Sequence, residues 1–125
     1  MVRTIASAIL ALLLIFGISV VETSFVKKTF ETFDKSLTEL YKKAEDGNAT
    51  YADGNAVRIF WRDKKRVLHI LIPHTSIETV DYQLNEALGY LYEGKYDDAL
   101  PKIEVLIEIA KKIPRAYSFR LENVF

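Results

Sequence analysis

The sequence predicts an all-α protein with an N-terminal transmembrane helix, followed by an up-down antiparallel bundle of about four helices and a short C-terminal helical tail. Three observations predict this fold class. An uncharged apolar run extends from Thr4 to Val21. Beyond it, apolar residues recur at alternating spacings of three and four, which is typical of one buried helix face. The chain of 125 residues has only five Gly and three Pro, whereas a β-sandwich would need many turns.

The apolar run predicts a membrane anchor over residues 1–21. At about 1.5 Å per residue it spans roughly 27 Å, close to the hydrocarbon thickness of a bilayer. A cleaved secretory signal is the main alternative, and Gly17 with Ser19 would supply the small residues that cleavage needs. That pair lies inside the run rather than after it. A buried core helix would need neighbours on every side. The chain has no cysteine, which excludes a lipoprotein site.

The charges that flank the run bear on orientation. Arg3 and the N-terminal amine favour a cytoplasmic N-terminus by the positive-inside rule. Lys27, Lys28 and Lys35 argue for the reverse by plain count. We expect a single-pass protein of the cell membrane with its C-terminal domain outside the cytoplasm.

Residues 22–125 are predicted to form one helical bundle domain. The first helix of this domain covers about Glu22 to Glu45, and nothing separates it from the anchor. Its apolar seam could pack inside the bundle or form a homodimeric coiled coil, and periodicity leaves both open. The seam consists of Val26, Phe30, Phe33, Leu37 and Leu40, with Ala44 beyond them.

Capping signals bound the next two helices. Thr50 and Asp53 form a capping box at the start of a helix that reaches Ile72, before Pro73. A second capping box, from Thr75 to Glu78, is predicted to start the third helix, which ends at Gly94 in a left-handed cap.

The fourth helix is predicted from Asp97 or Asp98 to Ile113, where Pro114 ends it. A short tail bearing Tyr117, Leu121, Val124 and Phe125 then folds back on the bundle. Apolar residues occupy more than half of the circumference of this helix, which is hard to bury in a bundle of four helices. The sequence therefore predicts a partner-facing surface at Val105, Ile109 and Ile113.

Asp81 lies on the apolar face of the third helix, where an unpaired carboxylate would be costly. Lys64 on the second helix and His74 are its candidate counter-charges. We hypothesise one buried polar network of Trp61, Lys64, His74 and Asp81. A small metal- or proton-handling site around His74 and Asp81 is an alternative, although two histidines without cysteine are a poor set of metal ligands.

A basic stripe follows the second helix. Lipid headgroups or anionic wall polymers could bind to it, or it could be a solvated face that pairs with acidic neighbours. Seventeen Lys and Arg balance seventeen Asp and Glu over the whole chain, which argues against a nucleic-acid partner. The stripe consists of Arg58, Arg62, Lys65, Arg66 and His69.

The sequence shows no catalytic constellation. It offers no thiol, no serine in a glycine-flanked elbow and no glycine-rich loop before a helix. We therefore expect neither an enzyme nor a bound cofactor.

The segment from Trp61 to Leu84 carries a family resemblance. Trp61, Lys64-Lys65, Leu68, Leu71-Ile72, His74, Ile77, Val80-Asp81 and Leu84 resemble the core of a bacterial single-anchor DUF family, numbered four-three-six-three, and the anchor and the C-terminal residues fit as well. The resemblance implies short helical proteins with no assigned activity, often encoded beside multi-pass membrane proteins of the YetF type.

Together these observations favour a non-enzymatic, membrane-anchored accessory or scaffold protein whose partner is an integral membrane protein. The first alternative is a binding module that holds a lipid, peptide or cell-wall component in a helical groove.

Overall fold

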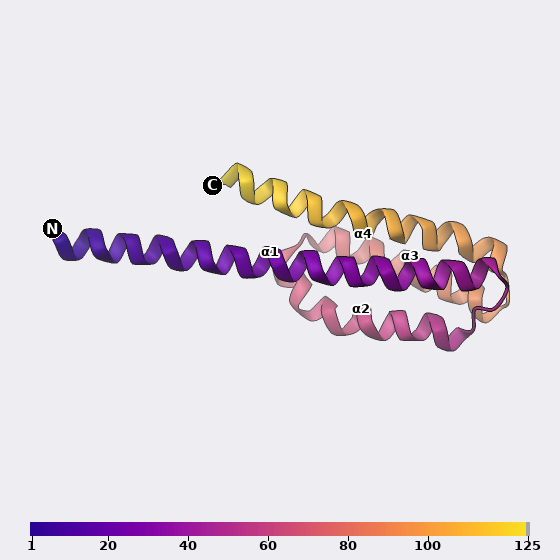
Figure 1. The fold of residues 1–125 in the computed structure, drawn as a ribbon. Coiled ribbons are helices and arrows are strands. Elements are labelled where there is room, and N and C mark those ends of the chain that lie inside the picture. The colour runs from indigo at the N-terminus through magenta and orange to yellow at the C-terminus, as the bar shows by residue number, and fades with distance from the viewer. Residues whose placement is uncertain (125) are drawn as a thin grey trace.

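The computed structural model describes residues 1–124, and the side chains of residues 1–119. Over this part of the chain, four helices run up and down in sequence (Figure 1). They are α1 (Val2–Glu45), α2 (Tyr51–Leu71), α3 (His74–Tyr92) and α4 (Tyr96–Val124). The expected all-α fold, with a long apolar helix at the N-terminus and helices packed against one another, is confirmed.

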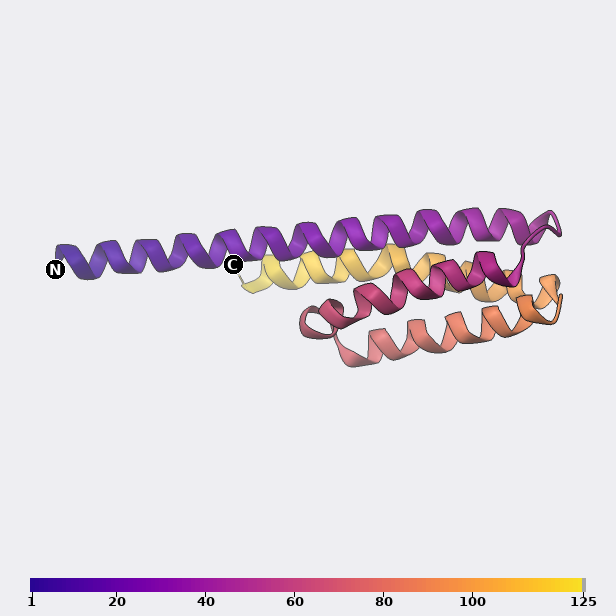
Figure 2. The same cartoon turned by 90° about the horizontal axis from the view of Figure 1, so that it is seen from below.

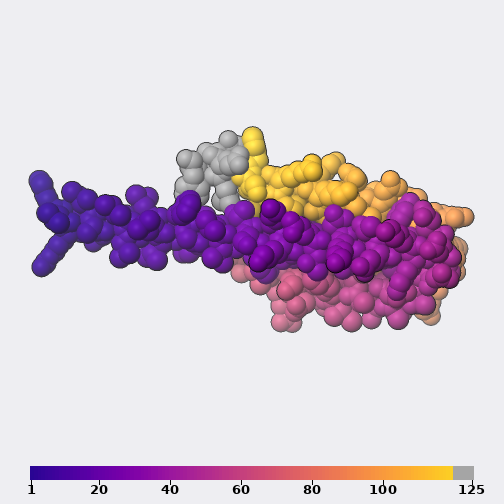
Figure 3. Space-filling view, in the orientation of Figure 1, coloured from indigo at the N-terminus to yellow at the C-terminus, as the bar shows by residue number. Residues whose placement is uncertain are grey.

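The helix α1 is continuous over 44 residues, or about 66 Å. Its first turns project beyond the rest of the molecule as a narrow rod (Figure 3). In the described part of the chain it is the one helix that is long and apolar enough to cross a membrane. None of the residues in its most apolar stretch is buried. This exposure contradicts the alternative of a buried core helix.

The C-terminal half of α1 supplies one wall of the core. Its seam faces the other helices, because an apolar residue every three or four positions returns to the same side of the helix. Val26, Phe30, Phe33 and Leu37 are 0% exposed and Leu40 is 3% exposed. Of the two alternatives that periodicity left open, packing inside the bundle is what the structure shows for this seam, and a homodimer through it would require the bundle to open.

Helix ends follow the local sequence at two of the three turns. The Thr50 side chain accepts a hydrogen bond from the Asp53 amide, and the Asp53 carboxylate accepts one from the Thr50 amide, so the predicted capping box is present. Gly47 and Gly94 have φ of 72° and 73° after the ends of α1 and α3, a conformation that glycine adopts without a steric penalty.

The start of α3 differs from the expectation. The helix begins at His74, with Pro73 at the N-cap and no side-chain cap. The amides of Ser76 and Ile77 bond to the Pro73 carbonyl instead. These bonds start the helix one residue before Thr75, so the predicted capping box from Thr75 to Glu78 does not form.

The predicted end of the fourth helix at Pro114 is wrong, because α4 continues to Val124. Pro114 has no amide hydrogen to donate to the Ala110 carbonyl, yet packing on α1 holds the next turn. Tyr117 is 8% exposed and its hydroxyl lies 3.3 Å from Glu22 Oε2. Burial and the neighbouring Glu22 carboxylate raise the pKa of Tyr117.

The tail does not fold back on the bundle. Its last turns run beside the apolar part of α1, as two perpendicular views show (Figures 1 and 2). The predicted contacts of the Leu121, Val124 and Phe125 side chains lie outside the described residues.

Candidate functional site

A polar cluster joins α2 to α3 midway along the bundle. The indole Nε1 of Trp61 donates a hydrogen bond to Asp81 Oδ1 at 2.7 Å, and Lys65 Nζ lies 3.1 Å from Asp81 Oδ2. Trp61 is 2% exposed, and its ring stacks on Phe33 of α1 at a centroid distance of 5.1 Å. Packing therefore fixes the indole so that its N–H points at the carboxylate.

A close approach of the two helices makes this contact possible. Gly54 of α2 faces Leu88 and Leu91 of α3, and a Cβ at Gly54 would collide with Leu88 Cδ2. The absence of a side chain at Gly54 lets the backbones lie near each other, two turns before Trp61.

The structure corrects the expected partners of Asp81. Lys64 Nζ lies 6.0 Å from the ring centroids of Phe25 and Phe60, on the α1 side of α2. One helical position changes direction by about 100°, so Lys65 faces α3 where Lys64 cannot.

His74 also lies outside the cluster. Its Nε2 lies 2.9 Å from Glu78 Oε1, and the ring stacks on His69 at a centroid distance of 5.3 Å. The His74 side chain is 70% exposed, because it begins α3 at the end of the bundle. The predicted four-residue network is thus reduced to Trp61 and Asp81, with Lys65 in the place of Lys64. Asp81 itself is half-buried rather than buried.

The metal alternative receives no geometric support. Across the part of the chain that the structure describes, no three side chains of His, Cys, Asp and Glu converge as metal ligands. His74 pairs with Glu78, whereas Asp81 pairs with Lys65.

A cavity of about 310 Å³ lies between α1 and α2, but the cavity of about 280 Å³ beside Asp81 has the more distinctive chemistry. Three cationic side chains and a single carboxylate line it. The guanidinium of Arg58 donates only to neutral oxygens, at 3.4 Å to Tyr51 Oη and 3.3 Å to Asn85 Oδ1, and its Nε is buried without a partner. The lining consists of Arg58, Trp61, Arg62, Lys65, Asp81, Leu84 and Asn85.

Such a cavity can accept an anion chemically. Guanidinium and ammonium groups bind phosphate or carboxylate by charge-assisted hydrogen bonds, and one carboxylate offsets one of the three positive charges. The basic stripe seen in the sequence contains the three cations. Nothing in the sequence indicated that Asn85 of α3 would complete the lining.

The predicted partner-facing residues of α4 separate in the structure. Val105 is 42% exposed, whereas Ile109 and Ile113 are partly buried against the core. The helix packs extensively against both α1 and α3, so two neighbours cover a wide apolar arc. Ile109 and Ile113 are thus partly covered inside the bundle, and a partner at this surface stays a prediction.

The comparisons with known proteins agree with the resemblance carried by the segment from Trp61 to Leu84. No curated protein and no solved structure matches the chain. The sequence model of the family described as "Domain of unknown function (DUF4363)" matches residues 20–124, which cover α2, α3, α4 and the bundle half of α1. The chain therefore belongs to the DUF4363 family.

Proposed function

We propose that this protein is a non-enzymatic, membrane-anchored accessory or scaffold protein that presents its bundle to an integral membrane protein of the cell envelope. The observation that carries the proposal is the continuity of α1. One unbroken helix contains the exposed apolar run and the seam of the core. Only four residues separate Val21 from Val26, the first buried seam residue.

Because α1 has no break, it fixes the orientation of the bundle relative to the apolar run. The seam fixes how α1 is rotated within the bundle, and the same rotation continues into the apolar run. A bundle held in this way presents the same face at the same height above the bilayer. That geometry suits a partner embedded beside it better than a soluble ligand that arrives from any direction.

The test changes the rotation of the bundle about α1 while leaving its core intact. Two alanines inserted between Val21 and Glu22 turn the bundle by about 200° and raise it by about 3 Å. Four alanines turn it by about 400°, which is close to the starting orientation, and raise it by about 6 Å. The assay purifies the tagged full-length chain from membranes after crosslinking.

We expect the crosslinked membrane partner to be lost with two alanines and retained with four. Equal recovery of partners from both variants would contradict presentation of a fixed face. Recovery of the intact chain without detergent in the soluble fraction would refute anchoring. An N-terminus trimmed near Gly17 would identify the apolar run as a cleaved signal instead.

The expected orientation, with the bundle outside the cytoplasm, has a separate test. The chain has no cysteine, so Asn48→Cys places a single thiol in the exposed turn at the far end of the bundle. We expect a membrane-impermeant maleimide to label this thiol in intact cells. Labelling only after lysis would place the bundle in the cytoplasm.

The cavity between α2 and α3 favours a second candidate function, a binding module for an anionic group on a lipid, peptide or cell-wall component. Inorganic phosphate is the simplest probe, and fluorescence of Trp61, which lines the cavity, is the readout. Arg62→Gln should weaken binding, whereas Arg66→Gln, one turn further and outside the lining, should not. The absence of any saturable change in fluorescence would remove this candidate.

A further inference from the structure

The charges of the bundle are distributed unevenly along its long axis. The contact of Tyr117 with Glu22 and the position of Lys64 over Phe25 set the register of α4 and α2 against α1. The last turns of α2 and the turn into α3 therefore lie beside the point where α1 leaves the bundle, and the part of α4 just before Tyr117 lies there too (Figures 1 and 2).

We call this part of the bundle the near end, and define it as residues 22–30, 64–82 and 109–117. It contains eight Lys and Arg against three Asp and Glu, an excess of five positive charges. The part of the bundle farther from the apolar run, residues 31–63 and 83–108, contains seven Lys and Arg against thirteen Asp and Glu, an excess of six negative charges. A chain with zero formal net charge thus folds into an electric dipole along its length.

The positive charges of the near end are available for binding. Glu22 accepts a hydrogen bond from Tyr117, Glu78 pairs with His74, and Asp81 pairs with Lys65. Among the side chains that the structure describes, Lys65 is the only one of the eight cations in an ion pair. The others lie on α1 (Lys27, Lys28), on α2 (Lys64, Arg66) and on α4 (Lys111, Lys112, Arg115).

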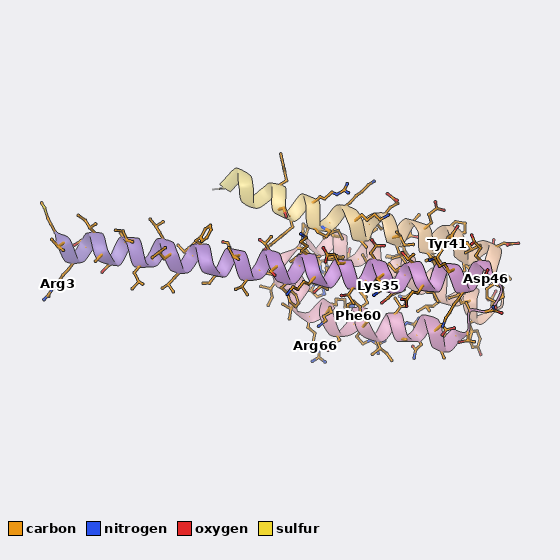
Figure 4. The ribbon with its side chains drawn as sticks, in the orientation of Figure 1. Arg3, Lys35, Tyr41, Asp46, Phe60 and Arg66 are labelled. Atoms are coloured by element: carbon orange, nitrogen blue, oxygen red, sulfur yellow. The ribbon has the colours of Figure 1, made fainter. Side chains whose placement is uncertain are left out.

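These cations belong to three helices, because α2 and α4 both pack against α1. Figure 4 shows Arg66 at the near end of α2, directed away from the bundle. Ile70 is 81% exposed and Phe119 is 64% exposed at the same end. Exposed apolar side chains among cations are typical of surfaces that lie on a bilayer.

We propose that the near end docks on anionic phospholipid headgroups of the bilayer that holds α1, an inference that rests on the proposed anchoring. Lys28, the second of the two near-end lysines on α1, lies about 10 Å beyond Val21, and a headgroup layer is roughly 5–8 Å deep. Lys and Arg side chains reach several ångströms toward such a layer. A bilayer that surrounds α1 must meet cations on all three helices, whereas a single acidic protein partner could contact only one side.

The test measures which lipids gather around the full-length protein. Ile70→Cys in the cysteine-free chain carries a fluorophore, and the protein is reconstituted in phosphatidylcholine vesicles with a minority of phosphatidylglycerol. Energy transfer to headgroup-labelled phosphatidylglycerol is compared with transfer to headgroup-labelled phosphatidylcholine. One cation near an anionic surface favours the anionic lipid by up to about five-fold, so we expect clear enrichment of phosphatidylglycerol in the protein with native charges.

Two variants with the same change in net charge locate the effect. Lys28→Gln, Arg66→Gln, Lys112→Gln and Arg115→Gln together should bring the enrichment close to one. Lys35→Gln, Lys42→Gln, Lys43→Gln and Lys95→Gln, all outside the near end, should leave it unchanged. Enrichment should also disappear at about 1 M salt, where the Debye length is about 3 Å.

The outcomes separate docking from anchoring. If the protein floats with the vesicles but shows equal transfer to both lipids, docking is refuted and anchoring stands. If both variants lose enrichment equally, the near end is not the site. If the near-end variant keeps the lipid enrichment but loses a crosslinked membrane protein, the surface binds an acidic partner and the lipid proposal is overturned. If the protein floats with no vesicle, the proposed anchoring itself fails.

Discussion

Replacing Asp81 by Asn tests whether the cluster between α2 and α3 stabilises the bundle. The Asn oxygen can still accept the Trp61 hydrogen bond, but the bond changes from charge-assisted to neutral, a loss of about 1 kcal/mol. The ion pair with Lys65 is also lost. Both side chains of that pair are 32% exposed, so this adds at most about 1 kcal/mol. We therefore expect Asp81→Asn to lower the free energy of unfolding by about 1–2 kcal/mol.

Asp81→Leu should cost more. It leaves the Trp61 N–H buried without an acceptor, and the desolvation of one unpaired donor adds about 1–3 kcal/mol. If the bond between the two residues causes the loss, Trp61→Phe should make Asp81→Leu less damaging. In a double-mutant cycle the two changes would then be less than additive.

Glu78→Gln is the matched control on the same helix. Glu78 is 56% exposed and pairs with the exposed His74, and such surface pairs contribute between zero and about 1 kcal/mol. Urea unfolding of the full-length chain in mild detergent, followed by helical circular dichroism, measures all variants. The stabilising role of the cluster is refuted if Asp81→Asn unfolds at the same urea concentration as the unsubstituted chain. It is also refuted if Asp81→Asn needs as much urea as Glu78→Gln.

Three further substitutions can be measured by the same unfolding assay. Gly54→Ala should destabilise the bundle by about 1–3 kcal/mol because Leu88 must move, despite the better helix propensity of Ala; a gain in stability would show that Leu88 repacks freely. Pro114→Ala should stabilise it by up to about 3 kcal/mol by restoring an amide donor within α4, and a loss would show that the helix depends on the proline ring. Asp53→Asn should cost about 1 kcal/mol through the cap of α2. Hydrogen bonds from the Thr50 amide and from Lys43 lower the pKa of Asp53, so its contribution should be present above about pH 4. It should be lost as the pH falls through the lowered pKa, and Asp53→Asn should remove this part of the acid sensitivity.

The helices and their ends could be predicted where neighbouring residues in the sequence determine the backbone conformation. The seam of α1, the Thr50 cap and the left-handed Gly94 depend on residues within a few positions of one another, and all three are present. Pro114 shows where that logic fails. A proline ends an isolated helix, but the contact of Tyr117 with Glu22, 95 residues away in sequence, keeps α4 helical. No local pattern contains that contact.

Two of the four predicted members of the cluster, Trp61 and Asp81, are in contact, whereas Lys64 and His74 lie outside it. Trp61 and Asp81 lie on facing helix sides, and periodicity was enough to pair them. The choice between Lys64 and Lys65 depends on the rotation of α2, since adjacent positions differ by about 100°. That rotation is set by Trp61 packing on Phe33 and by the contact of Gly54 with Leu88, and sequence spacing shows neither contact.

The uneven distribution of charge along the bundle could not be predicted from the sequence, for a different reason. Composition averages over the chain, and seventeen positive charges against seventeen negative ones give zero wherever they lie. The excess at the near end comes from segments around Lys28, Arg66 and Lys112, which are separated by whole helices. Only the antiparallel register brings them to the end from which α1 leaves the bundle. Because α1 is continuous, the packing that sets this register also sets the height of the cations above a bilayer. A shift of α2 or α4 by two turns along α1 would move its cations by about 11 Å, roughly one Debye length at 0.1 M salt, and the proposed docking on headgroups would lose most of its attraction.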